Sequence, residues 1–283
     1  MNNDPSKTGA IGPEDYAEPR CLLCDEPYGK EPEVRSVPQQ RIIEKNDEYL
    51  AKRDYEGAER HLLYWLEEAR LGNDKRGMLV IANELIGHYR KCGNRDKALE
   101  NVDLALKLLD GLGFEDSPTA GTTYVNCATA CNAFSENDRS MGYFEKARKI
   151  YENIPGISDT LLGGLYNNMG LCCRALKRYG DARDFFEKAT ACMERVENGE
   201  LERAITCLNV ADVEADEKGL VDGEQEIYAL LDRAYDLLKN NNAPRDGYYA
   251  FVCEKCAPVF KYYGYFLAAE EFSDIAKKIY ERA

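Results

Sequence analysis

The stretch YNNMGLCCRALKRYGDARDFFEKATACM at residues 166–193 decides how the chain folds. Its small and apolar residues recur every three or four positions, which is the period of an amphipathic α-helix. Gly170, Ala182 and Ala189 are the small residues of this pattern, and Phe186 comes one turn before Ala189. Small side chains let two antiparallel helices approach closely, and a ring one turn away fills the adjoining groove. The stretch therefore predicts two packed antiparallel helices.

The same arrangement recurs along most of the chain. The second helix of each predicted pair carries an alanine, or once a tryptophan, near its middle: Trp65, Ala105, Ala147, Ala189, Ala234 and Ala276. The neighbours in this series are 40 to 45 residues apart. We therefore expect six helix pairs, over residues 39–74, 75–115, 117–156, 158–198, 199–242 and 244–283.

Residues 166–193 resemble a tetratricopeptide repeat (TPR), with the small and aromatic residues in the hallmark places of that family. A second copy includes Leu85, Tyr89, Gly93, Ala98 and Ala105. The period exceeds the usual 34 residues by about 8, so the repeats are similar to the long-helix type of kinesin light chains and bacterial peptide-sensing regulators. The resemblance spans about residues 39–283. It implies an all-α, right-handed solenoid whose first helices line a concave, peptide-binding wall.

Composition excludes several classes of function. With 37 basic and 51 acidic residues, the net charge of −14 argues against nucleic acid and anionic membranes as partners. No apolar run reaches the roughly 20 residues that a membrane span needs, and the first residues lack a secretory signal. We therefore expect a cytoplasmic protein. With two histidines and no phosphate loop, HExxH motif or serine elbow, the sequence predicts no enzyme.

Three asparagines mark a candidate binding site on the predicted inner wall. Two residues before the small position of each first helix, the sequence places Glu44, Glu84, Asn126, Asn168, Asn209 and Lys255. An amide both donates and accepts, so a ladder of asparagines can bind an extended peptide backbone. In the resembling families, asparagines at this place often hold the peptide main chain. The alternative is that each amide bonds a neighbouring helix and stiffens the superhelix.

Basic residues extend the candidate site. Arg90, Arg174 and Lys261 occupy equivalent places, and Asn83 and Asn167 precede the two arginines by two helical turns on the same face. Amides together with guanidinium groups suit carboxylates, including the C-terminus of a peptide. The alternative is ordinary surface ion pairing, which contributes little.

Residues 1–38 differ from the repeats, because they hold six of the ten prolines. We expect an extended tail that covers the first helix pair, lies in the chain's own groove or is disordered. Cys21 and Cys24 have the spacing of a metal or redox pair. Zinc needs four ligands, and no second pair follows in the tail. Zinc is therefore the one cofactor that the sequence leaves open.

The last repeat is rich in aromatic residues, namely Tyr248, Tyr249, Phe251, Phe260, Tyr262, Tyr263, Tyr265 and Phe266. They form either an exposed docking face or dimer contact, or the buried outer face of a terminal repeat.

For the whole chain we favour a scaffold that binds an extended segment of a partner protein. The alternatives are a receptor for a small regulatory peptide and a metal- or thiol-dependent regulator that uses Cys21 and Cys24.

Overall fold

The computed structural model describes residues 34–114 and 116–282. These residues form twelve helices and no strand. In chain order the helices are α1 (Gln39–Ala51), α2 (Tyr55–Leu71), α3 (Lys75–Lys91), α4 (Arg95–Leu112), α5 (Pro118–Ala133), α6 (Asn137–Asn153), α7 (Asp159–Ala175), α8 (Tyr179–Met193), α9 (Glu200–Asp222), α10 (Glu224–Lys239), α11 (Gly247–Tyr262) and α12 (Phe266–Tyr280). None of these helices is long and apolar enough to span a bilayer.

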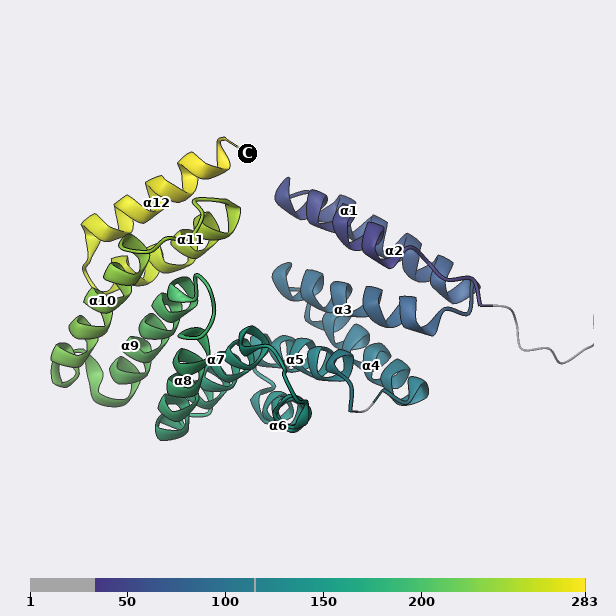
Figure 1. The fold of residues 1–283 in the computed structure, drawn as a ribbon, viewed down its shortest axis with the longest axis horizontal. Helices are drawn as coiled ribbons and strands as arrows, with labels where there is room; N and C mark the ends of the chain where they lie inside the picture. Colours follow the sequence, from purple (N-terminus) through teal and green to yellow (C-terminus); the bar gives the residue numbers. More distant parts are fainter. Residues whose placement is uncertain (1–33, 115, 283) are drawn as a thin grey trace, which may run out of the picture.

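The helices form six consecutive pairs, which we number as units one to six. Each pair lies inside one of the six residue ranges given by the repeat spacing. Consecutive helices contact each other from α1 to α10 and again at α11 and α12, and each first helix also contacts the first helix of the following unit. The pairs follow a curved path, with α3, α5, α7, α9 and α11 toward its inner side and α4, α6, α8, α10 and α12 toward its outer side (Figure 1). The predicted all-α solenoid is confirmed.

Small residues lie where the helices of a unit cross. Ala98, Ala182 and Ala147 are fully shielded from solvent. At Gly170, even a Cβ atom would come 2.6 Å from the ring of Phe186. The backbones therefore approach as closely as the small residues in the sequence indicated.

Capping side chains begin several helices and also fix the segment before α1. Asp74 Oδ1 accepts a hydrogen bond of 2.9 Å from the Gly77 backbone, which satisfies a free N–H in the first turn of α3. Its Oδ2 accepts another of 2.9 Å from the Val37 backbone. Arg35 N also donates to Gly72 O at 2.8 Å. Residues 35–37 therefore lie against the connection between α2 and α3.

The first helices of the fifth and sixth units each contain a residue that is unusual inside a helix. In the stretched fifth unit, α9 continues to Asp222 across Gly219, whose φ of 82° and ψ of 168° break the helical path. Glycine tolerates this left-handed φ because it has no Cβ. In the sixth unit, α11 begins at Gly247 and continues through Pro258. Pro258 therefore does not mark the start of this helix.

The curvature brings the first and last units together. Arg53, in the turn after α1, donates from Nη2 to Glu254 Oε1 of α11 at 3.3 Å. The side chains are 70% and 50% exposed, so this ion pair contributes little to stability. The shape of the array therefore depends on packing between consecutive helices rather than on this contact.

The helix crossings predict opposite effects of one substitution at two glycines. A Cβ at Gly121 of α5 would come 2.1 Å from the ring of Tyr151, which is buried, whereas Gly142 of α6 has open space. Gly121→Ala should lower the free energy of unfolding by about 1–3 kcal/mol through overpacking. Gly142→Ala should raise it by about 0.5–1 kcal/mol, because alanine favours a helix.

Urea unfolding followed by circular dichroism would measure both effects. A stabilising Gly121→Ala would contradict the close crossing of α5 and α6.

Candidate functional site

Asn83, Thr123 and Asn126 form a hydrogen-bonded group, the first amide triad, between two inner helices. Asn126 Nδ2 on α5 donates to Asn83 Oδ1 on α3 at 2.9 Å. Asn83 Nδ2 donates in turn to Thr123 Oγ1 at 3.1 Å and to Leu79 O at 3.0 Å. Thr123 is fully buried, and shielding from water strengthens such bonds. This triad joins the second unit to the third.

The same group recurs two units later. Asn209 Nδ2 on α9 donates to Asn167 Oδ1 on α7 at 3.0 Å. Thr206 Oγ1 also donates to this oxygen, at 3.3 Å. Asn167, Thr206 and Asn209 are the second amide triad, which joins the fourth unit to the fifth. Four of the five candidate asparagines thus bond to one another, as the stiffening alternative described.

Asn168 is the fifth asparagine, and it has no hydrogen-bond partner within residues 34–114 and 116–282. Its side chain is partly exposed. In the repeat spacing, the place that Asn83 and Asn167 occupy in their units belongs to Val125 in the third unit. Valine offers no hydrogen bond to the following unit, so the Asn168 amide is free to bind a ligand.

Arg174 is held by two carboxylates of the next inner helix. Its Nη1 donates to Asp212 Oδ2 at 2.7 Å, and its Nε donates to Asp216 Oδ2 at 2.6 Å. Tyr263 Oη of the last unit donates to the other Asp212 oxygen at 2.8 Å. Arg174 therefore fastens α7 to α9, and its guanidinium is already occupied.

Arg90 occupies the equivalent place on α3, yet no described residue forms a hydrogen bond or ion pair with its side chain. Its side chain is partly buried, and this burial lowers the pKa of the guanidinium. The two amide triads show which positions of α5 and α9 are equivalent, because Asn126 and Asn209 make the same hydrogen bond in each. In that alignment Thr129 and Ala133 stand where α9 carries Asp212 and Asp216. Because α5 supplies no carboxylate here, Arg90 is a cation available to an anionic ligand.

Glu84 occupies the ladder position of the second unit. Asn46 Nδ2 of α1 donates to Glu84 Oε2 at 3.0 Å, while the buried Asn46 Oδ1 has no partner in the described part of the chain. Burial and the nearby Asp47 raise the pKa of the Glu84 carboxyl. The first inner step of the wall is therefore an incompletely satisfied polar contact rather than an amide triad.

Some aromatic residues of the last unit are buried, and others are exposed as a docking face would require. Tyr249 and Phe260 are buried, whereas Tyr248, Phe251 and Tyr262 are 43–70% exposed. Tyr248 Oη donates to Glu202 of α9 at 2.5 Å. The exposed rings extend the candidate wall to α11, where they offer apolar contact beside the amides.

The cysteines give no second site in the described residues. Cys21 and Cys24 lie outside these residues, and the other nine cysteines are free. Burial raises the pKa of Cys127 and of Cys256 to about 12, so both stay protonated and unreactive at neutral pH. Within residues 34–114 and 116–282, no three histidine, cysteine or acidic side chains gather into a metal site.

Comparison with known structures identifies the fold. The chain is similar to BtubC (BKLC) from P. vanneervenii, with a TM-score of 0.61 and 24% sequence identity over 72% of this chain and 82% of that one. A putative kinesin light chain from Podosopora anserina with nearly identical TPR-like repeats aligns at 14% identity and a TM-score of 0.48, over 70% and 92% of the two chains. The chain is a TPR-like array.

Sequence comparison adds nothing to this, because no protein-family model and no curated protein matches the chain. The TPR-like array confirms the fold class and the structural resemblance expected from the repeats. The candidate residues on its inner wall remain predictions.

The two arginines predict unequal effects on stability. Arg174→Ala leaves Asp212 and Asp216 close together without their cation, and should lower the free energy of unfolding by about 1–3 kcal/mol. Arg90→Ala should change it by no more than about 0.5 kcal/mol, because no hydrogen bond is lost. Urea titration of the two variants beside the wild type makes the comparison. Equal losses would mean that Arg90 also has a partner within the chain.

Glu84 predicts a pH-dependent effect. Its raised pKa means that the folded state favours the protonated carboxyl, so stability is lost as pH rises through that pKa. Glu84→Gln should therefore stabilise the protein by about 1 kcal/mol near neutral pH. The gain should shrink as the pH is lowered, because the wild-type carboxyl then becomes protonated as well.

The measurement is urea unfolding of both proteins at stepwise lower pH. Glu44→Gln is the matched control, since Glu44 holds the same ladder position in the first unit but is exposed. A gain that stays constant with pH would contradict the assignment to Glu84.

Proposed function

We propose that this TPR-like array is a non-enzymatic protein-interaction scaffold that binds an extended peptide segment of a partner along its inner wall. One contrast carries the proposal. Arg174, Asn126 and Asn209 are occupied by neighbouring helices, whereas their counterparts Arg90 and Asn168 have no partner within the described residues. Each of the two side chains is only partly buried and neither has a buried polar atom without a partner, so their polar groups can still be reached by a ligand.

The chemistry of these two side chains indicates the kind of peptide. The Arg90 guanidinium presents parallel N–H groups that suit a carboxylate, from an acidic side chain or from a peptide C-terminus. The Asn168 amide can donate to a main-chain carbonyl and accept from a main-chain N–H, which requires no particular side chain. The exposed rings of Tyr248 and Phe251 add apolar contact farther along the wall. The preferred ligand is therefore an extended peptide with an acidic group near one end.

The amide triads have a supporting role in this proposal. They fix the spacing between α3 and α5 and between α7 and α9, so the free side chains stay in register with each other. A wall that is rigid before binding loses less conformational entropy when the peptide binds.

Charge and thiol chemistry support the choice of partner and compartment. A net charge of −14 disfavours nucleic acid, which needs clustered cations. Free cysteines suit a reducing compartment, so we place the interaction in the cytoplasm.

Peptide selection followed by mutation would test the proposed function. Random peptides of about 15 residues, which span roughly 50 Å when extended, are selected on the wild type and their affinities measured by fluorescence anisotropy. Arg90→Ala and Asn168→Ala should each weaken selected peptides about tenfold, since each removes a partly shielded polar contact. Lys107→Ala and Asn153→Ala on the outer helices α4 and α6 are the matched controls, with affinity unchanged.

Three outcomes would contradict the proposal. If both inner-wall variants keep full affinity for every selected peptide, the inner wall is not the binding site. If shortened peptides of four or five residues or so bind as tightly as the full length, the chain is a receptor for a small regulatory peptide. If binding requires zinc and is lost in Cys21→Ser, the N-terminal cysteine pair controls function.

A further inference from the structure

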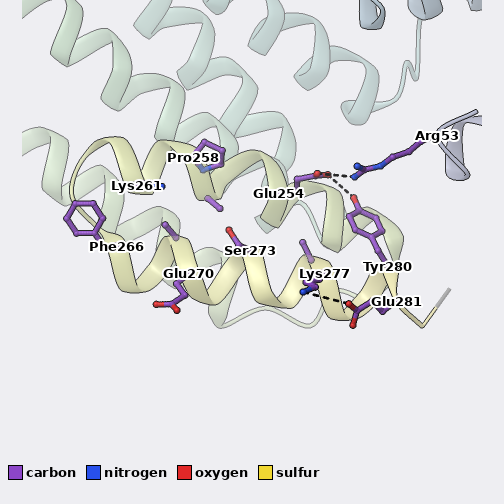
Figure 2. A pocket seen from close by; sticks show the side chains of 13 residues that line it. Arg53, Glu254, Pro258, Lys261, Phe266, Glu270, Ser273, Lys277, Tyr280 and Glu281 are labelled. Atoms are coloured by element: carbon purple, nitrogen blue, oxygen red, sulfur yellow. Dashed lines mark hydrogen bonds and ion pairs between the residues drawn. The ribbon is translucent and has the colours of Figure 1, made fainter. Parts of the chain in front are cut away.

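A groove lies on the open end of the array, between α11 and α12 of the last unit (Figure 2). Its volume is about 890 Å³. Ala257, Ala269 and Ala276 line it, and Phe266 and Tyr280 stand near the two ends of α12. Phe266 is 65% exposed.

The groove exists because one residue departs from the repeat. Ser273 stands three positions before Ala276, where five other units carry a buried apolar side chain: Leu62, Val102, Phe144, Phe186 and Leu231. A serine is smaller than any of these and does not fill the space between α11 and α12. Ser273 is instead exposed.

Inside the array, this surface is covered by the first helix of the following unit. In the fourth unit, Phe186 belongs to the same buried cluster as Val213 of α9. Arg183, the counterpart of Glu270, donates from Nε to Glu214 Oε1 of α9 at 2.6 Å. The groove at α11 and α12 is therefore shaped for a helix that runs antiparallel to α12, as consecutive helices of the array do.

The charges on α12 fit a second copy of α12 in that orientation. Glu270 has no ion pair within the described residues, and Lys277 has only a contact of 4.0 Å with Glu281. The two lie seven residues apart, two turns along one face. A two-fold axis close to Ser273 would place Glu270 beside Lys277 of the second copy, and Lys277 beside its Glu270. The same axis would bring Phe266 close to the second copy's Tyr280.

We infer that two copies of this chain associate through the end grooves, with α12 of each copy antiparallel to α12 of the other. The interface is isologous, since one surface meets itself across the axis. Small residues at Ala269, Ser273 and Ala276 allow the helices to approach, and two Glu270–Lys277 pairs set the register. Arg53 reaches Glu254 at one edge of the groove and leaves the face of α12 open (Figure 2). This inference does not depend on peptide binding at the inner wall.

Sedimentation equilibrium of the full chain tests the interface by charge reversal. The wild type should be a dimer. Glu270→Lys and Lys277→Glu should each raise the dimer dissociation constant by about tenfold or more, because like charges replace two ion pairs. The double variant E270K/K277E should restore the wild-type value, since the charges then exchange places across the axis. Asp274→Lys makes the same charge change outside the groove lining and should alter the constant by no more than about twofold.

A cross-link provides a second measurement that does not depend on charge. Ser273→Cys places two thiols near the axis, so mild oxidation should link two copies through a disulfide. Asp274→Cys should link far less, and the oxidised wild type accounts for the native cysteines.

Four results would overturn the inference. The first is a dimer that the single charge reversals leave intact, and the second is a double variant that does not recover. A monomeric wild type with a reactive thiol at Ser273→Cys would show an open groove. A monomeric wild type in which that thiol is protected would assign the groove to residues 1–33 of the same chain.

Discussion

Close approach of helices at small residues is the constraint on which the rest of this structure depends. Gly121 and Gly170 lie directly against the rings of Tyr151 and Phe186, and no side chain larger than hydrogen fits there. These contacts set the angle and spacing of the two helices in the third and fourth units. The inner helices then meet at fixed distances, and only for that reason can the amides of the two triads reach each other at about 3 Å.

The polar side chains of the inner wall divide into those that bond to a neighbouring unit and those that have no partner in the described residues. A residue type repeated at one position forms a bond between units wherever the neighbouring unit supplies the complementary group. Arg174 finds two carboxylates, and Arg90 finds threonine and alanine in the same places. Whether such a side chain is occupied within the array therefore depends on the neighbouring unit, not on the residue itself.

The sequence alone predicted the architecture well, because each of the six units carries its own copy of the small-residue signal. A departure at a single position, such as Trp65 in place of alanine, does not hide a pattern that recurs in so many units. Pro258 lies on the exposed side of α11 and does not end that helix.

The candidate site was harder to predict, because it depends on pairs of residues rather than on a recurring one. Asn126, Asn168 and Asn209 look identical in the repeat, and only Val125 in place of an asparagine distinguishes the surroundings of Asn168. Val125 is visible in the sequence, but its effect on Asn168 can be recognised only when it is known which residues of neighbouring inner helices face each other. The end groove depends on Ser273, which replaces the apolar side chain of the other units. The serine indicates a groove only when it is known that no helix of the described residues covers α12 at this place.

The two amide triads have a consequence for how such a chain can change its length. Asn83 and Asn167 are 84 residues apart, as are Arg90 and Arg174, so the inner wall repeats every two units although the helices repeat every one. Excision of the fourth unit alone would place Val125 against Asn209 and remove the second amide triad. Excision of the third and fourth units together would instead place Asn83 against Thr206 and Asn209, and so restore an amide triad at the junction. Between the second and fifth units, the amide contacts of the inner wall thus repeat with a module of four helices rather than with a single helix pair.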